Sequence, residues 1–163
     1  MSLFDWGSQD AVDVAEIDAE HRAIFLMGAE LERAVAARAP QARMREIVRT
    51  LVDGAEKHFA HEERLMRTAR YYGFKWHKKQ HDDARRQLKK FAKRIEADDR
   101  EAPDQLPYYL AHWLRFHIGL TDCMMSAGLR NFERQQAVSE GSRSTFRTDA
   151  DQDSEVMPIS VPN

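Results

Sequence analysis

The chain has 163 residues, of which 42% are hydrophobic and 32% charged, enough for one buried core beneath a well-solvated surface. Its 25 basic and 27 acidic residues leave a net charge of −2, so nothing in the charge balance points to a nucleic-acid partner. No apolar run approaches membrane-spanning length, the N-terminus lacks the pattern of a signal peptide, and the single cysteine, Cys123, cannot form an internal disulfide. We therefore expect a cytoplasmic protein without a membrane segment.

Apolar residues recur at helical spacing along most of the chain, and strand-like alternation is absent. An opening arm runs to about Ile17 and carries Phe4 and Trp6, which we expect to cover one end of a bundle. Asp18 is predicted to cap the first helix, and Pro107 to lie in the first turn of the fourth. The four predicted helices cover residues 18–38, 41–67, 75–99 and 107–135. Short turns between them predict an all-α, up-down-up-down four-helix bundle.

The composition changes at about Ala137, after which Ser, Thr, Asp, Gln and Arg dominate as far as Glu155. Such a segment has little to bury, so we divide the chain into a bundle domain over residues 1–136 and a disordered tail over 137–163. The final residues, VMPISVPN, could dock on an unidentified protein partner, and a free end is the alternative. A single soluble bundle is compatible with a monomer.

Histidines interrupt the core-facing stripe of every predicted helix. The polar members of these stripes are His21, His58, Glu62, His77, His81 and His117. An unpaired buried polar group costs about 1–3 kcal/mol, so burying all of them without partners would be strongly unfavourable. A shared partner is therefore required.

The same residues fall at one level of the predicted bundle. Counted from a first turn near Ala39, His21 lies 18 residues before it and His58 lies 19 after it. Counted from a second turn near Arg70, His58 lies 12 residues before it and His81 lies 11 after it. At about 1.5 Å of rise per residue these mismatches amount to a few ångströms. Nitrogen and carboxylate ligands without a thiolate suit iron, manganese or zinc better than calcium.

The spacing of these residues resembles the signature of the hemerythrin family. The pattern consists of His21, His58-x3-Glu62, His77-x3-His81 and His117-x4-Asp122. The flanking sequences IDAEH (17–21), HFAHEERLM (58–66) and HKKQH (77–81) are also similar to the family's, and the resemblance covers about residues 1–134. Asp122 is assigned from the resemblance alone, because five residues of regular α-helix turn it about 140° away from His117.

The resemblance implies a non-haem di-iron centre. In it, one iron would be held by His77, His81 and His117, the other by His21 and His58, and both by the bridging Glu62 and Asp122. With a bridging oxo or hydroxo group, these ligands fill all but one of the roughly 12 positions around two octahedral Fe2+ or Fe3+ ions. One open position suits O2, so we expect reversible dioxygen binding by a carrier, store or sensor that is not an enzyme.

The fourth helix poses a geometric problem at the metal layer. For Asp122 to reach it, we expect a π-bulge or a local bend between His117 and Asp122, since about 4.4 residues per turn would align the two side chains. The alternative is a regular helix in which rotation and side-chain length absorb the angle.

Two other functions remain open. One is a di-iron enzyme with peroxidase, ferroxidase or nitric-oxide chemistry, and the other is iron storage or delivery. Ferritin-like oxidases use Glu-x-x-His motifs, and no histidine here has a glutamate three residues before it. The His-Glu-x-x-His pattern of zinc proteases is also absent.

The neighbours of the signature residues receive simpler interpretations. We expect His61 and His112 to be surface groups or neighbours of ligands, and Glu63 to be a solvated residue. Phe59 and Trp113 are expected to wall the oxygen pocket, with ordinary core packing as the alternative.

Overall fold

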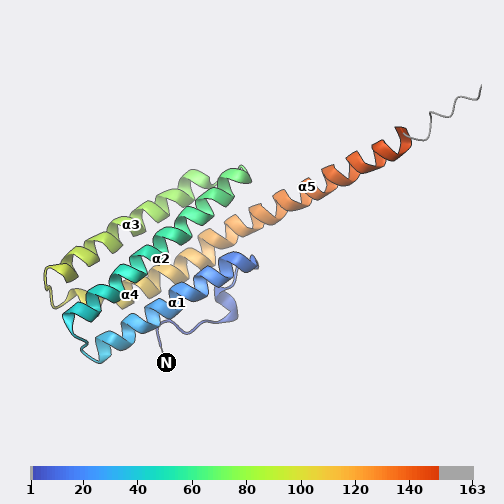
Figure 1. The fold of residues 1–163 in the computed structure, drawn as a ribbon. Coiled ribbons are helices and arrows are strands. Elements are labelled where there is room, and N and C mark those ends of the chain that lie inside the picture. The colour runs from blue at the N-terminus through green and yellow to red at the C-terminus, as the bar shows by residue number, and fades with distance from the viewer. Residues whose placement is uncertain (1, 151–163) are drawn as a thin grey trace, which may run out of the picture. The chain divides into compact units, whose positions relative to one another are not determined.

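The computed structural model describes the backbone of residues 2–150 and the side chains of residues 2–140. Its long helices are α1 (Ala15–Ala36), α2 (Gln41–Thr68), α3 (Phe74–Glu96), α4 (Ala102–Phe116) and α5 (Cys123–Ala150). A π-helical turn, η2 (His117–Asp122), joins α4 to α5, and a short 3-10 helix, η1 (Ser8–Asp10), lies in the arm. Figure 1 shows α1 to α4 side by side with alternating chain direction, and the part of the chain that is described contains no strand. The predicted all-α, up-down-up-down bundle is confirmed.

The first helix begins at Ala15, three residues before the predicted N-cap. Asp18 lies inside α1 and is buried, and its Oδ1 accepts a hydrogen bond from the backbone N–H of Val12 at 2.8 Å. The prediction that Asp18 caps the helix is therefore wrong. Its carboxylate instead binds the arm that precedes α1.

The fourth helix begins at Ala102 rather than near Pro107. Pro103 occupies its first turn, where a missing N–H costs no hydrogen bond. Asp99 Oδ1 accepts hydrogen bonds from the backbone N–H groups of Glu101 (2.9 Å) and Ala102 (3.3 Å). Two prolines lie close together here, and the first rather than the second marks the helix start.

The C-terminal helix α5 runs to Ala150, so the helix end predicted near Gln135 is corrected. Between Gln135 and Ala150 there is one glycine, Gly141, and no proline, so little in the local sequence stops a helix there. The chain divides into a compact unit, Met1–Leu129, and a second unit, Arg130–Asn163. The last part of the predicted tail, 151–163, lies outside the described residues.

The interior of the first unit contains one large apolar cluster and a smaller one, which consists of Met66, Tyr71, Met125 and Leu129. The large cluster includes Ile17, Ile24, Leu31, Met44, Leu51, Ala55, Ala84, Leu88, Ile95, Leu110 and Leu114, which recur at helical spacing. Within residues 2–150, no helix combines the length and the hydropathy that crossing a bilayer requires.

The N-terminal arm packs on this core from outside. The buried Phe4 and the partly buried Trp6 both meet the ring of Phe25 edge-on, with centroids 6.3 and 5.2 Å away. Arg115 of α4 fastens the arm, because its Nη1 donates to Asp10 Oδ1 at 2.7 Å. The arm is therefore tied to both α1 and α4.

Candidate metal centre

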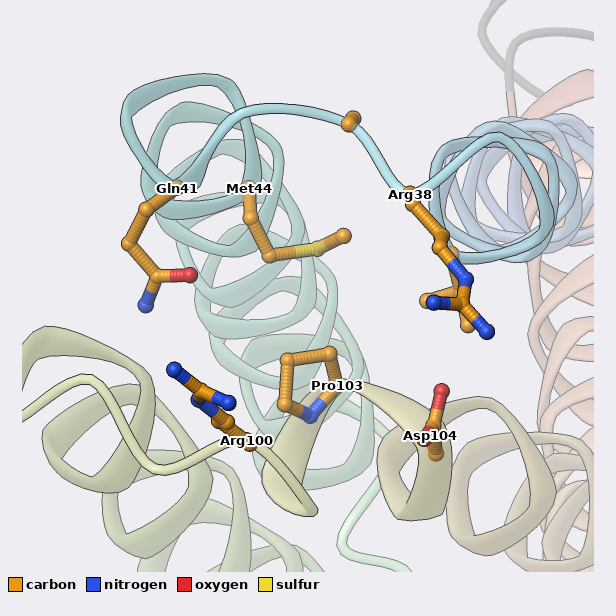
Figure 2. Close-up of a pocket in the computed structure, with 8 residues that line it drawn as sticks. Arg38, Gln41, Met44, Arg100, Pro103 and Asp104 are labelled. Atoms are coloured by element: carbon orange, nitrogen blue, oxygen red, sulfur yellow. The ribbon is translucent and has the colours of Figure 1, made fainter.

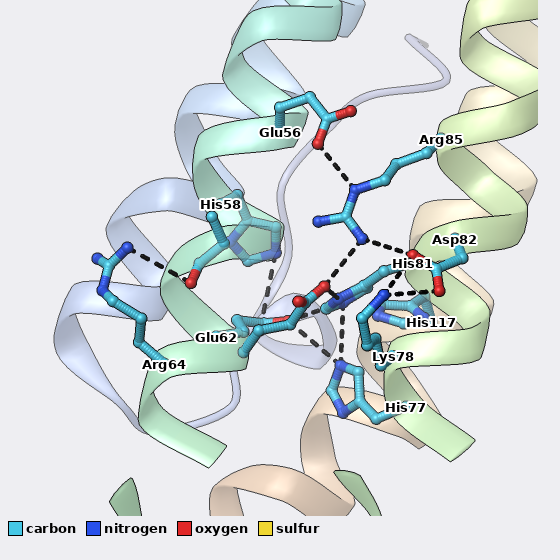
Figure 3. Close-up of polar contacts among 12 residues, drawn as sticks. Glu56, His58, Glu62, Arg64, His77, Lys78, His81, Asp82, Arg85 and His117 are labelled. Atoms are coloured by element: carbon cyan, nitrogen blue, oxygen red, sulfur yellow. Dashed lines mark hydrogen bonds and ion pairs between the residues drawn. The ribbon is translucent and has the colours of Figure 1, made fainter. Parts of the chain in front are cut away.

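The seven predicted ligands converge in one buried layer of the bundle. They are His21 of α1, His58 and Glu62 of α2, His77 and His81 of α3, and His117 and Asp122 of η2. None of the seven is more than 3% exposed. Figure 3 shows several of these side chains directed into the same space between the helices. The common level counted along the sequence is confirmed.

Asp122 reaches this layer because the fourth helix is π-helical from His117 to Asp122. A wider turn brings side chains five residues apart close to alignment. Accordingly, Asp122 Oδ1 lies 3.1 Å from Nε2 of His117. The predicted departure from α-helical hydrogen bonding is confirmed.

The Glu62 carboxylate faces histidines on two sides. Its Oε2 lies 3.2 Å from Nε2 of His77 and 3.1 Å from Nε2 of His81. Its Oε1 lies 3.7 Å from Nε2 of His58. The two oxygens of one carboxylate are therefore directed at imidazoles from different helices.

The Asp122 carboxylate has the same two-sided arrangement. Its Oδ1 lies 3.1 Å from Nε2 of His117 and 3.2 Å from Nε2 of His77. Its Oδ2 lies 3.2 Å from Nε2 of His21. Asp122 thus connects the fourth helix to α1 as well as to α3.

These contacts define two overlapping groups of donor atoms, each with its atoms within 4.8 Å of one another. The first group consists of Glu62, His77, His81, His117 and Asp122, and the second of His21, His58, Glu62 and Asp122. Both carboxylates belong to both groups. Two adjacent cations that share two carboxylates would use every one of these donors.

Several polar atoms of the layer are buried without a hydrogen-bond partner among the described residues. They are His21 Nδ1 and Nε2, His77 Nδ1, His117 Nε2, Glu62 Oε1, Asp122 Oδ1 and Asp122 Oδ2. Each such atom costs about 1–3 kcal/mol if nothing satisfies it. A first-row cation would coordinate the lone pairs of the Nε2 and carboxylate oxygen atoms, and a set of imidazoles and carboxylates without thiolate fits iron.

The surrounding histidines keep the two carboxylates ionised. Burial and the charge of Asp122 would raise the pKa of Glu62, but the neighbouring histidines outweigh them and lower it to about 2. Burial likewise opposes ionisation of Asp122, and its contacts with His117, His21 and His77 hold its pKa well below the usual range. The carboxylates are therefore anionic and available to a cation.

Two glutamates outside the layer contact the far nitrogen of ligand histidines. Glu20 Oε2 lies 2.9 Å from Nδ1 of His58, and its Oε1 lies 2.7 Å from Nδ1 of His61. On the other side, Glu63 Oε1 lies 3.4 Å from Nδ1 of His81. A carboxylate in this position orients an imidazole and directs its Nε2 to the metal.

The interpretation of Glu63 as a solvated residue is wrong. It is buried, and its Oε1 accepts a hydrogen bond from Nη1 of Arg85 at 2.8 Å. Burial would raise the pKa of Glu63, but the hydrogen bond and charge of Arg85 outweigh burial and lower it. Reasoning from the sequence missed this role because the partner, Arg85, lies 22 residues away on another helix.

Two aromatic rings form an apolar wall beside the layer. Phe59 stacks on His81 with centroids 4.3 Å apart and planes 19° apart, and Trp113 stacks on His117 at 4.3 Å and 17°. The two aromatic rings meet each other edge-on at 5.6 Å. Both residues therefore stack on candidate ligands, and their role as walls of an oxygen pocket stays a prediction.

A separate hollow of about 460 Å³ is lined by residues of the turn between α1 and α2 and by residues at the start of α4. Its lining includes Arg38, Met44, Arg100 and Asp104 (Figure 2). None of its lining residues is among the seven candidate ligands, so the hollow does not belong to the metal layer.

Comparisons with known proteins agree with this geometry. Residues 12–125 match the family model described as the hemerythrin HHE cation binding domain. The bacteriohemerythrin of Pseudomonas aeruginosa is 32% identical over 118 residues, which cover 72% of this chain and 76% of that protein. A hemerythrin subunit of Sipunculus nudus is 29% identical over 119 residues, which cover 73% of this chain and 87% of that protein.

A solved structure shares the fold. The crystal structure of a hemerythrin mutant superposes with a TM-score of 0.74 at 25% identity, over 79% of this chain and 98% of that one. The family match runs from residue 12 to residue 125 and so includes all seven residues of the histidine and carboxylate layer. The chain therefore belongs to the hemerythrin family.

Proposed function

We propose that this protein binds two iron ions in the layer and takes up dioxygen reversibly. The observation that carries the proposal is the sharing of Glu62 and Asp122 between two groups of histidines. Iron, when bound, supplies the redox chemistry that dioxygen binding requires. The names of the relatives, one a bacteriohemerythrin and one a hemerythrin, support the same assignment.

The two halves of the layer are unequal in their nitrogen donors. One iron would be held by His77, His81 and His117, and the other by His21 and His58, with both carboxylates common to the two. Because the second group contains one imidazole fewer, it leaves room for a small ligand. That side of the layer is where we place dioxygen binding.

The residues around the donors favour binding over turnover. Phe59 and Trp113 cover the imidazoles of His81 and His117 with apolar rings, which shields from water the half of the layer next to the proposed dioxygen position. The donor set is rich in histidine, whereas ferritin-like di-iron proteins rely on Glu-x-x-His carboxylates. The layer accordingly resembles a carrier site more than an oxidase site.

Rapid mixing of the reduced, iron-loaded protein with oxygenated buffer tests the proposal. We expect about two irons per chain and an absorption band that forms with O2, disappears when O2 is removed, and returns over several cycles. Conversion to the oxidised protein in every cycle, with consumption of reductant, would identify an enzyme instead. One metal per chain, or zinc taken up in preference to iron, would contradict the di-iron assignment.

A further inference from the structure

We propose that Arg85 is a positioning residue of the metal layer, which acts on His81 through both Glu63 and Phe59. The proposal rests on the proposed function, because His81 is one of the proposed iron ligands. Arg85 stands four residues after His81 on α3 and contacts none of the donor nitrogens itself. Its effect on the layer must therefore pass through its neighbours.

Three carboxylates fix the guanidinium group of Arg85. Its Nε donates to Glu56 Oε2 at 2.8 Å, and its Nη1 donates to Asp82 Oδ1 at 2.9 Å (Figure 3). Nη1 also donates to Glu63 Oε1 at 2.8 Å. The side chain is only 17% exposed, so solvent screens these charge-assisted bonds less than at an open surface. The guanidinium is thus held in one place from α2 and α3 together.

The first route from Arg85 to the layer runs through Glu63. The same oxygen, Glu63 Oε1, that accepts the hydrogen bond from Arg85 lies 3.4 Å from Nδ1 of His81. A carboxylate that touched only the imidazole could rotate away from it. Because Arg85 holds Glu63 in place, the carboxylate stays where it orients the His81 ring.

The second route runs through Phe59. The Cζ atom of Arg85 lies 5.2 Å from the centroid of the Phe59 ring, a cation–π contact. The Phe59 ring in turn stacks on His81 at 4.3 Å. One guanidinium therefore restrains the imidazole of His81 both at its edge, through Glu63, and at its face, through Phe59.

The other half of the layer has only a looser counterpart, because the Cζ atom of Arg22 lies 4.9 Å from the centroid of the Trp6 ring, and that ring is 6.5 Å from the His21 ring. Glu20 holds His58, but the Glu20 side chain is 34% exposed and its second partner is His61 rather than an arginine. The half that contains His77, His81 and His117 is therefore the more firmly organised. A change at Arg85 should weaken metal binding in that half first.

Cobalt titration of the metal-free protein tests this inference, since the visible absorption of Co2+ reports its coordination. The variants are Arg85→Gln, Arg85→Lys and, as a matched control, Arg86→Gln at an exposed arginine that pairs with Asp83. In Arg85→Gln we expect the affinity for one of the two Co2+ ions to fall about 10-fold or more, as for other groups that orient a ligand histidine, with the second ion less affected. Arg86→Gln should bind both ions as wild type does.

Arg85→Lys keeps the positive charge but loses the planar guanidinium group, which hydrogen-bonds to Glu56, Glu63 and Asp82 at once. We expect it to fold and still to bind one ion more weakly, with an altered Co2+ spectrum, so the inference can be judged even if Arg85→Gln is unstable. If Arg85→Lys, or a folded Arg85→Gln, binds both Co2+ ions with the affinity and spectrum of the wild type, Arg85 has no positioning role. That result would leave the proposed function untouched. Failure of the wild-type protein to take up two ions would overturn the proposed function, and this inference with it.

Discussion

Asp122 Oδ1 lies 3.1 Å from Nε2 of His117, although the two residues stand five apart in one helix. The π-helical turn η2 makes this approach possible. The other oxygen of Asp122 lies 3.2 Å from Nε2 of His21 on α1. One carboxylate therefore contacts a histidine of its own helix and one of the neighbouring α1. The geometry of the helix and the geometry of the site depend on each other.

The shared carboxylates lead to a prediction about metal content. Because Glu62 faces both groups of histidines, Glu62→Gln should lower iron at both positions, to well below one ion per chain. Iron per chain, measured with a colorimetric chelator, checks this. Glu46→Gln, at a glutamate whose side chain is 66% exposed, is the control and should retain about two irons. One fully retained iron in Glu62→Gln would show that Glu62 binds a single metal.

Replacement by alanine should change the free energy of unfolding in opposite directions at two glycines, Gly28 and Gly119. A Cβ at Gly28 would lie 2.4 Å from ring atoms of Phe4, so Gly28→Ala should lower the free energy of unfolding by about 1–3 kcal/mol. A Cβ at Gly119 would meet nothing within 4 Å, so Gly119→Ala should raise it by about 0.5–1 kcal/mol. Chemical denaturation of the two variants gives both values. Equal effects at the two positions would mean that Phe4 does not pack on Gly28 in solution.

Tyr109 should make the fold sensitive to strongly alkaline pH. Burial raises the pKa of Tyr109 to about 12, above the value of about 10 for an unfolded chain. The folded state therefore disfavours the phenolate, so this group adds no pH dependence below about pH 10 and costs stability as the pH rises from about 10 towards 12. In an absorbance titration at 295 nm, the late step should be smaller in Tyr109→Phe, where Tyr71 remains as a second tyrosine whose pKa burial raises. Ionisation of Tyr109 near pH 10 would contradict its burial.

Removal of the C-terminal residues should leave the bundle intact. We expect a chain truncated after Gln136 to keep its melting temperature within a few degrees and to bind about two irons, because residues 133–140 are all exposed. Truncation after Met124 is the contrasting variant. It retains every candidate ligand but loses the buried Met125 and Leu129, and its melting temperature should fall. A loss of iron from the chain truncated after Gln136 would show that the domain boundary lies beyond Gln136.

The bundle and its polar layer were predictable because both follow from periodicity. Core positions repeat at helical spacing, and heights counted from the turns are enough to place His21, His58 and His81 at one level. Asp122 required the family resemblance. Its position then predicted the π-turn, since no regular helix brings it beside His117.

What the sequence did not reveal depends on contacts between helices. Glu63 looked solvated because it follows a ligand and neighbouring helical residues point apart, yet Arg85 of α3 draws it into the interior. Asp18 looked like a cap because its residue type suits one, but it bonds to Val12 of the arm instead. Side-chain pairings of this kind have no period along the chain, so they become visible only in three dimensions.

The layer takes its donors from His21 to Asp122, and this span has a consequence for synthesis. At about 5–20 residues per second, a ribosome needs roughly 5–20 s to add the residues between them. A nascent chain that ends after α3 has four of the five histidines but lacks His117 and Asp122. The arm likewise lacks its tie to α4 until Arg115 has been made. A cation held by the complete layer can therefore be enclosed only late, once the fourth helix has left the ribosome and closed the bundle.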